Sequence, residues 1–183
     1  GLTAGASVLK IIDSNPSSEL PILVTGATGG VGSVAIMLLS KLGFDVCALT
    51  GKPEANSFLT QLGATSTIIR SDYLDAPAKP MARPMYAGAV DTVGGSILGK
   101  LLSEIAPHGL VSCCGNVGGM ELNTTVFPFI LRGISLCGID SAESAIEFKK
   151  GLWERFSNDW KLDLSASTKE ISKDQLGEEI QKI

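Results

Sequence analysis

The chain has 183 residues, of which 44% are hydrophobic and 19% are charged, with a formal net charge of -4. One domain of this length can bury a core without disulfides or metals, and a mean hydropathy of +0.27 suits a parallel sheet covered on both faces. Without a Lys/Arg cluster, a long apolar run or a leader pattern, we expect a cytoplasmic protein that binds neither nucleic acid nor membrane.

Apolar periodicity and turn residues predict alternating helices and strands in chain order. Helices are expected over residues 2–12, 33–42, 53–62, 96–105 and 142–160. Strands are expected over residues 20–25, 44–50, 66–69, 87–93, 110–114 and 134–139. Residues 71–84 read as a connection, 126–131 as a short apolar segment and 169–171 as a further short strand. Ser172 and Gln175 then form a capping box for a helix that runs off the end of the chain.

Six strands separated by crossovers of helical length predict an α/β fold. Parallel neighbours need such crossovers, so we expect a Rossmann-like, doubly wound parallel six-stranded sheet with helices on both faces. The whole of residues 1–183 is interpreted as one nucleotide-binding domain. Because the chain opens with glycine and stops within a helical pattern, we expect it to be a piece of a longer protein.

A glycine turn over residues 26–32 follows the first strand and opens a helix. Gly29 would let a pyrophosphate approach the backbone, and Gly32 would let helix and strand pack closely. The pattern is A-x-G-x-x-G, with Ala27 at the first position of the dinucleotide fingerprint. A glycine-rich turn can simply be tight, but the strand before it and the helix after it favour dinucleotide binding.

The end of the second strand predicts which dinucleotide is bound. An NAD enzyme places an Asp or Glu there for the ribose, whereas this chain has Thr50, Gly51 and Lys52. A hydroxyl, a free amide and an ammonium can all bind the 2′-phosphate of NADP, so NADP is favoured. Arg70, after the third strand, is expected on the same side.

Two other enzyme classes share parts of this pattern. Residues 25–32 also satisfy the turn of short-chain dehydrogenases, which need a catalytic Tyr-x-x-x-Lys pair. Pro77 follows Tyr73 by four residues and Val90 follows Tyr86, so neither tyrosine makes the pair. A nucleotide-fold methyltransferase would need an acidic ribose ligand, which the region of Lys52 lacks.

Several longer strings resemble the medium-chain dehydrogenase/reductase superfamily, in its zinc-independent quinone oxidoreductase branch and nearest to the acrylyl-CoA reductase subgroup. The strings are residues 1–5 (GLTAG), 24–32 (VTGATGGVG), 50–52 (TGK), 87–94 (AGAVDTVG), 124–133 (TTVFPFILRG) and 138–141 (GIDS). The resemblance implies hydride transfer from NADPH to an activated alkene (an enone or an acrylyl-CoA-like thioester) or to a quinone. It also implies that another domain supplies the catalytic residues.

The resemblance further implies where the cofactor lies. Residues 28–31 would line the pyrophosphate, residues 50–52 the adenosine phosphate, and the ends of later strands the ribose and nicotinamide. The predicted cofactor-binding residues are Ala27, Thr28, Gly29, Gly30, Val31, Gly32, Thr50, Gly51, Lys52, Arg70, Asp91, Thr92, Asn116 and Val117. Asp91 can alternatively brace the following turn, and Asn116 can alternatively be a turn former. No residue is predicted to be catalytic.

The remaining residues receive structural interpretations or stay open. The four cysteines lie in apolar runs without metal-ligand spacing, which predicts buried free thiols and no metal site. His108 has no neighbouring partner, Arg132 is interpreted as a surface residue, and Trp153 and Trp160 as packing residues of the helix over 142–160. The strand over 134–139 is a candidate edge for a homodimer. A non-catalytic NADP-binding or sensing module remains the alternative to an enzyme.

Overall fold

The computed structural model describes residues 1–181 and contains a six-stranded sheet in the order β3-β2-β1-β4-β5-β6. All neighbouring strands run parallel. The order reverses between β1 and β4, which confirms the predicted Rossmann-like, doubly wound topology. The strands are β1 (Ile22–Thr25), β2 (Val46–Thr50), β3 (Ser66–Ile69), β4 (Gly88–Asp91), β5 (Leu110–Cys113) and β6 (Ser135–Gly138).

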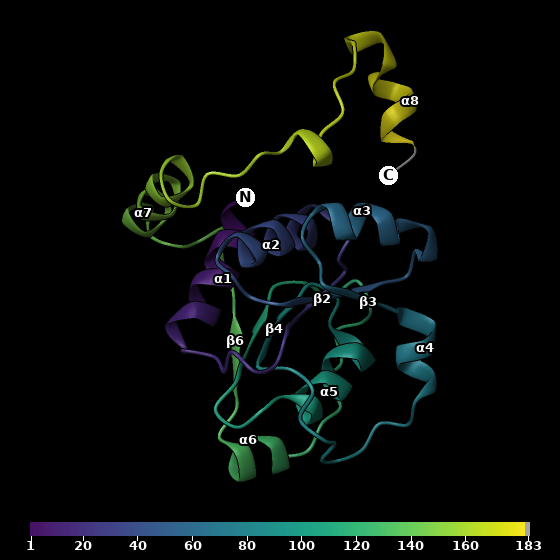
Figure 1. The fold of residues 1–183 in the computed structure, drawn as a ribbon, viewed down its shortest axis with the longest axis vertical. Coiled ribbons are helices and arrows are strands. Elements are labelled where there is room, and N and C mark those ends of the chain that lie inside the picture. The colour runs from purple at the N-terminus through teal and green to yellow at the C-terminus, as the bar shows by residue number, and fades with distance from the viewer. Residues whose placement is uncertain (182–183) are drawn as a thin grey trace.

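Helices cover both faces of the sheet (Figure 1). The first face carries α1 (Leu2–Asp13), α2 (Gly30–Lys41) and α3 (Asn56–Gln61), the last preceded by a 3-10 turn over Pro53–Ala55. The second face carries α4 (Arg70–Asp75), α5 (Gly95–Glu104) and α6 (Phe127–Arg132). A hydrophobic core lies on each face of the sheet, and successive side chains of a strand point to opposite faces. Ile22 and Val24 belong to the core under the first face, and Leu23 belongs to the core under the second. The central strands are buried throughout, as their apolar sequences predict.

The C-terminal segment leaves the sheet after β6. It forms α7 (Ile146–Ser157), short 3-10 turns over Ser165–Ser167 and Lys173–Gln175, and α8 (Leu176–Ile180), which projects away from the sheet in Figure 1. The capping box of Ser172 and Gln175 is present as predicted. The short strand expected over residues 169–171 is wrong, because no strand within residues 1–181 lies beside it to complete a hydrogen-bonded ladder. The last helix ends at Ile180, and residues 182–183 lie outside the described chain.

Helix α4 begins one residue before the stretch predicted to be a connection and ends within it. Only Tyr73 of this helix is buried, so no apolar periodicity marks it in the sequence. The helix is held from outside by Lys100 of α5, whose ammonium donates to the carbonyl oxygens of Tyr73 and, at 2.8 Å, of Ala76. A cation at the C-terminal end of a helix binds carbonyls that have no partner within the helix.

The helix predicted over residues 142–160 is shorter and less buried than expected. It begins at Ile146, which is 62% exposed, and Trp153 is also exposed at 54%. Leu152 is buried and Phe156 packs partly against the core. The helix therefore buries only a narrow stripe, while Trp160, beyond its end, is 1% exposed.

Candidate functional site: the dinucleotide cleft

The glycine turn connects β1 to α2 at the point where the strand order reverses. Gly26 has a φ of 59°, and a Cβ at this position would collide with Thr92 Oγ1. Ala27 is fully buried, and its amide donates to the carbonyl of Leu49 at 3.1 Å. The methyl group that departs from the glycine fingerprint therefore points into the protein, so it leaves the outer face of the turn open.

The start of α2 has the features of an anion-binding site. Gly29 is the N-cap residue, and no side chain caps the helix. Gly29 and Gly30 are exposed, and a Cβ at Gly30 would meet nothing within 4 Å. No side chain therefore competes for the amides of this first turn, where the positive end of the helix dipole favours a phosphate. Thr28 and Val31 border the turn and are half-buried.

Gly32 has a different role from Gly29. A Cβ at Gly32 would collide with the carbonyl oxygen of Gly26 and would lie 3.0 Å from the Cα of Ala27. Gly32 is buried, so this space cannot be gained by moving toward solvent. The residue lets α2 pack closely on the turn, as the fingerprint predicts.

The residues after β2 form an exposed basic corner. Thr50 is buried, and its hydroxyl accepts a hydrogen bond from the amide of Lys52 at 3.1 Å. The cationic groups that can meet a phosphate here are the Lys52 ammonium and a neighbouring guanidinium. The guanidinium belongs to Arg70, and an added Cβ at Gly51 would lie 2.9 Å from its Nη2. Arg70 directly follows β3 and is the first residue of α4.

Asp91 lies at the end of β4, beside the glycine turn, and is fully buried. Its Oδ1 accepts from the hydroxyl of Thr25 at 2.7 Å, and its Oδ2 accepts from the amide of Gly94 at 2.9 Å. Burial raises the pKa of the Asp91 carboxyl, although these hydrogen bonds oppose the rise. No part of Asp91 reaches the surface in this state, so the structure favours the bracing role over direct contact with a cofactor.

Thr25 and Thr92 complete a link between β1 and the loop after β4. The amide of Thr92 donates to Thr25 Oγ1 at 2.9 Å, and Thr92 Oγ1 donates to the carbonyl of Thr25, also at 2.9 Å. Thr25 was not predicted as a site residue. The available signal was a hydroxyl side chain at the end of an otherwise apolar, fully buried strand, where a buried polar group needs a partner.

Asn116 and Val117 follow β5 in a loop that is tied to the loop after β4. The amide of Gly118 donates to the carbonyl of Val93 at 2.8 Å, and the amide of Gly119 donates to the carbonyl of Asn116 at 3.0 Å. Asn116 is thus a turn former through its backbone, while its side chain is exposed. Val117 is 81% exposed and places an apolar side chain at this edge of the sheet.

His108 and Arg132 lie away from this edge. His108 precedes β5 and therefore lies at the amino end of the strands, opposite the glycine turn. The interpretation of Arg132 as a surface residue is wrong. Its guanidinium is part-buried and donates to the carbonyls of Ser103 at 2.8 Å and Ile105 at 2.9 Å, at the end of α5. Arginine near a helix C-terminus satisfies carbonyls that lack partners within the helix.

The described residues do not fit a metal site or a membrane span. Within residues 1–181, no three His, Cys, Asp or Glu side chains come together where they could hold a metal ion. No helix in the same range is long and apolar enough to cross a bilayer. All four cysteines are free, but only Cys47 is buried, and the other three are half-buried.

Comparison with known proteins decides the family. Residues 30–158 match the family model described as zinc-binding dehydrogenase. The chain belongs to this family. Its fold and relatives identify it as the cofactor-binding domain of the medium-chain dehydrogenase/reductase superfamily, which confirms the resemblance inferred from the sequence strings. The zinc in the family description has no counterpart among the described residues.

Individual relatives agree with this assignment. YhfP of Bacillus subtilis, whose name assigns it provisionally to the quinone oxidoreductases, is 46% identical over 175 residues, or 94% of this chain and 53% of that protein. Acrylyl-CoA reductase AcuI of Ruegeria pomeroyi is 40% identical over 164 residues, or 89% of this chain and 50% of the reductase. The chain therefore spans about half the length of the curated relatives it matches.

Solved structures of such proteins superpose closely on the chain. Bacillus subtilis yhfP with NAD bound has a TM-score of 0.90 at 42% identity, and the match covers 100% of this chain and 57% of that one. Escherichia coli K-12 YHDH with bound NADPH has a TM-score of 0.91 at 37% identity, covering 99% of this chain and 56% of that one. Both cofactors thus occur in proteins with this fold.

Proposed function

We propose that residues 1–183 form the NADP(H)-binding domain of an oxidoreductase. The observation that carries the proposal is the pairing of an uncapped, glycine-lined start of α2 with the basic corner of Lys52 and Arg70. A 2′-phosphate at that corner would meet two cations, and the carboxylate that binds the ribose of NAD is absent from residues 50–52. The NADPH bound to Escherichia coli YHDH supports the same choice.

The whole protein would use this domain to deliver a hydride from NADPH. The acceptor would be a small molecule, either an enone or acrylyl-CoA-like thioester or a quinone, as the names of the relatives suggest. The residues of this chain would bind the pyrophosphate at residues 28–31 and border the nicotinamide with Asn116 and Val117. NADPH supplies the hydride when bound, and positioning of the acceptor falls to residues outside this chain. A cytoplasmic location stays a prediction.

The phosphate site is tested by calorimetric titration of the chain with NADPH and with NADH. We expect NADPH to bind more tightly, and Lys52→Ala to weaken NADPH binding by about 1–3 kcal/mol, because a charge-assisted contact is lost. NADH binding should change little, since it has no 2′-phosphate. Lys41→Ala is the matched control, because Lys41 is also exposed but lies at the far end of α2. Equal affinities of the native chain for NADPH and NADH would contradict the proposal.

A homodimer formed through β6 is the second part of the proposal. β6 is an edge strand, and its neighbour on one side only is β5. The amides of Ser135 and Ile139 donate to the carbonyls of Gly109, just before β5, at 3.0 Å, and of Cys113 at 2.9 Å. By alternation the amide of Gly138 points to the free edge. Exposed Ile130 and Leu131 of α6 lie just before this strand and add an apolar surface.

Gly138→Pro tests this dimer. Proline would remove an edge amide without disturbing the bonds to β5, and a side chain at this position meets nothing within 4 Å. We expect sedimentation equilibrium to show a dimer for the native chain and a shift toward monomer for the variant. A native chain that stays monomeric at all concentrations would contradict the dimer, and so would a dimer of unchanged stability in the variant.

A further inference from the structure

A second cavity lies on the other side of the molecule from α2. It is open to solvent, has a volume of about 480 Å³ and is bordered by α4, the segment that follows it, and the second half of α5. Tyr86 precedes β4 and Glu104 ends α5, so their part of the cavity lies toward the amino end of the sheet, opposite the glycine turn. A volume of this size falls in the range of small-molecule sites.

The polar wall of the cavity is fixed by its own contacts. The hydroxyl of Tyr73 donates to Oε2 of Glu104 at 2.6 Å. The ammonium of Lys100 lies 4.3 Å from the centre of the Tyr73 ring and binds the carbonyls that end α4. Each of these three side chains thus has a hydrogen-bond partner, so the wall keeps its shape without a ligand.

Tyr86 is the exception in this wall. Its side chain lines the cavity and is only 4% exposed, yet within residues 1–181 its hydroxyl has no hydrogen-bond partner. Among the described residues, Ser7 Oγ is the one completely inaccessible side-chain polar atom without a partner. The Tyr86 hydroxyl must therefore keep some accessible surface, and the cavity is what it faces. A hydroxyl that faces a cavity and has no partner among the described residues is free to donate its hydrogen to a ligand.

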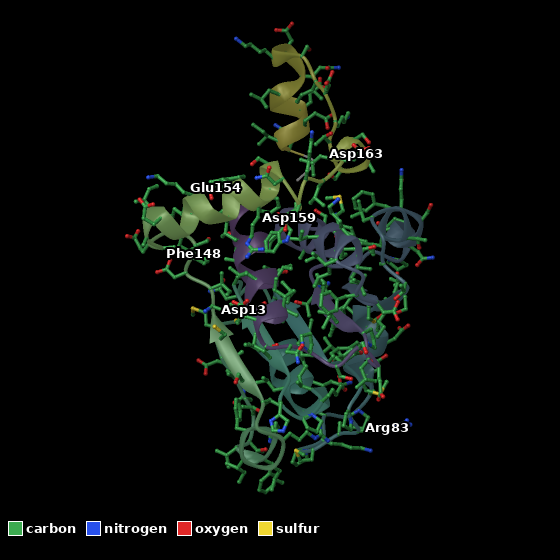
Figure 2. The ribbon with its side chains drawn as sticks, turned by 60° about the vertical axis from the view of Figure 1, so that its left-hand side comes forward. Asp13, Arg83, Phe148, Glu154, Asp159 and Asp163 are labelled. Atoms are coloured by element: carbon green, nitrogen blue, oxygen red, sulfur yellow. The ribbon has the colours of Figure 1, made fainter. Side chains whose placement is uncertain are left out.

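The mouth of the cavity is positively charged. Lys79 and Arg83 line it and are exposed, and Figure 2 shows Arg83 at the outer edge of the molecule, far from α7. The one exposed carboxylate of the lining, Asp72, accepts a hydrogen bond from Ser71 at 3.0 Å. Apolar surface from Ile68 and Met85 completes the lining. A ligand that matches this arrangement has an anionic end, an apolar body and a hydrogen-bonding head.

We propose that this cavity, here called the Tyr86 pocket, binds small hydroxyaryl carboxylates. The aromatic body lies against Ile68 and Met85, the hydroxyl oxygen accepts a hydrogen bond from Tyr86, and the carboxylate faces Lys79 and Arg83. Burial raises the pKa of the Tyr86 phenol, so the hydroxyl stays protonated and can donate at neutral pH. None of its lining residues is among the predicted cofactor-binding residues, so the proposal does not depend on which dinucleotide is bound.

The test uses the 183-residue chain and three probes, 4-hydroxybenzoate, benzoate and phenol. Titrations followed by NMR give dissociation constants and report on the methyl groups of Ile68 and Met85. We expect 4-hydroxybenzoate to bind most tightly and to shift both methyl signals. Tyr86→Phe should weaken 4-hydroxybenzoate by about 3- to 10-fold and leave benzoate unchanged, because one hydrogen bond is lost. Arg83→Gln should weaken both carboxylates but not phenol.

NADPH titration of each variant provides the control, since Tyr86 and Arg83 precede β4, at the opposite end of the strands from the glycine turn, and the affinity for NADPH should not change. The proposal is overturned if none of the probes binds saturably, or if benzoate and 4-hydroxybenzoate bind the native chain equally. Shifts confined to residues outside the pocket would also overturn it, and this readout is independent of whether either variant folds.

Discussion

Trp160→Ala is expected to lower the free energy of unfolding by about 3–5 kcal/mol, the usual loss when a buried tryptophan is truncated. Trp160 is 1% exposed and belongs to the core between the sheet, α1 and α2. Its ring meets Phe156 edge-on at a centroid distance of 5.8 Å, and the guanidinium of Arg155 lies 5.1 Å from its centre. The substitution would thus open a cavity and release the end of α7.

Trp153→Ala is the matched control for this prediction. Trp153 belongs to the same segment but is 54% exposed, so its loss should cost about 1 kcal/mol or less. Urea denaturation followed by circular dichroism measures both variants. If the two variants lost similar amounts of unfolding free energy, the burial of Trp160 would not be what stabilises α7.

Gly29→Ala and Gly32→Ala are expected to separate cofactor binding from folding. A methyl group at Gly32 collides with the backbone of Gly26, so this variant should lose about 1–3 kcal/mol of stability through a forced shift of α2. A methyl group at Gly29 lies 3.2 Å from the carbonyl of Gly26 but is otherwise unobstructed. Its stability should stay within about 1 kcal/mol of the native value. Its affinity for NADPH should fall by at least about tenfold, since the methyl occupies the approach of the pyrophosphate.

Thermal unfolding and NADPH titration of the two variants supply the measurements. Gly151→Ala is a suitable control, because Gly151 lies within α7 and an added Cβ there meets nothing within 4 Å. That variant should bind NADPH like the native chain. If Gly29→Ala also bound NADPH with native affinity, the turn would be tight for structural reasons alone.

Features that depend on neighbouring residues in the chain could be predicted from the sequence. The path from β1 through the glycine turn into α2 is contained within residues 20–42, and its strand, turn and helix signals are all local. The six strands could be predicted for the same reason, although several of the predicted first and last residues differ from those in the structure. The basic corner was located because Lys52 directly follows a strand.

Features that depend on distant residues could not be predicted. Helix α4 is held by Lys100, which lies 27 positions after Tyr73. The bracing role of Asp91 rests on Thr25, 66 positions earlier, and a sequence pattern cannot show that both carboxylate oxygens are engaged. The Tyr86 pocket was missed because the absence of a partner for one hydroxyl is a property of packing, not of order along the chain.

The pair of threonines between β1 and β4 has a consequence for how a dinucleotide is received. Thr25 and Thr92 are joined through two backbone groups and their own hydroxyls, and Asp91 fixes the same hydroxyl of Thr25. The loops on either side of the switch point are therefore preorganised, and their conformational entropy is lost when the chain folds rather than when it meets a ligand. Adaptation to different dinucleotides is left to exposed parts such as the Lys52 side chain. A single scaffold can in this way bind the pyrophosphate in one geometry, while the preference for NAD or NADP differs between relatives.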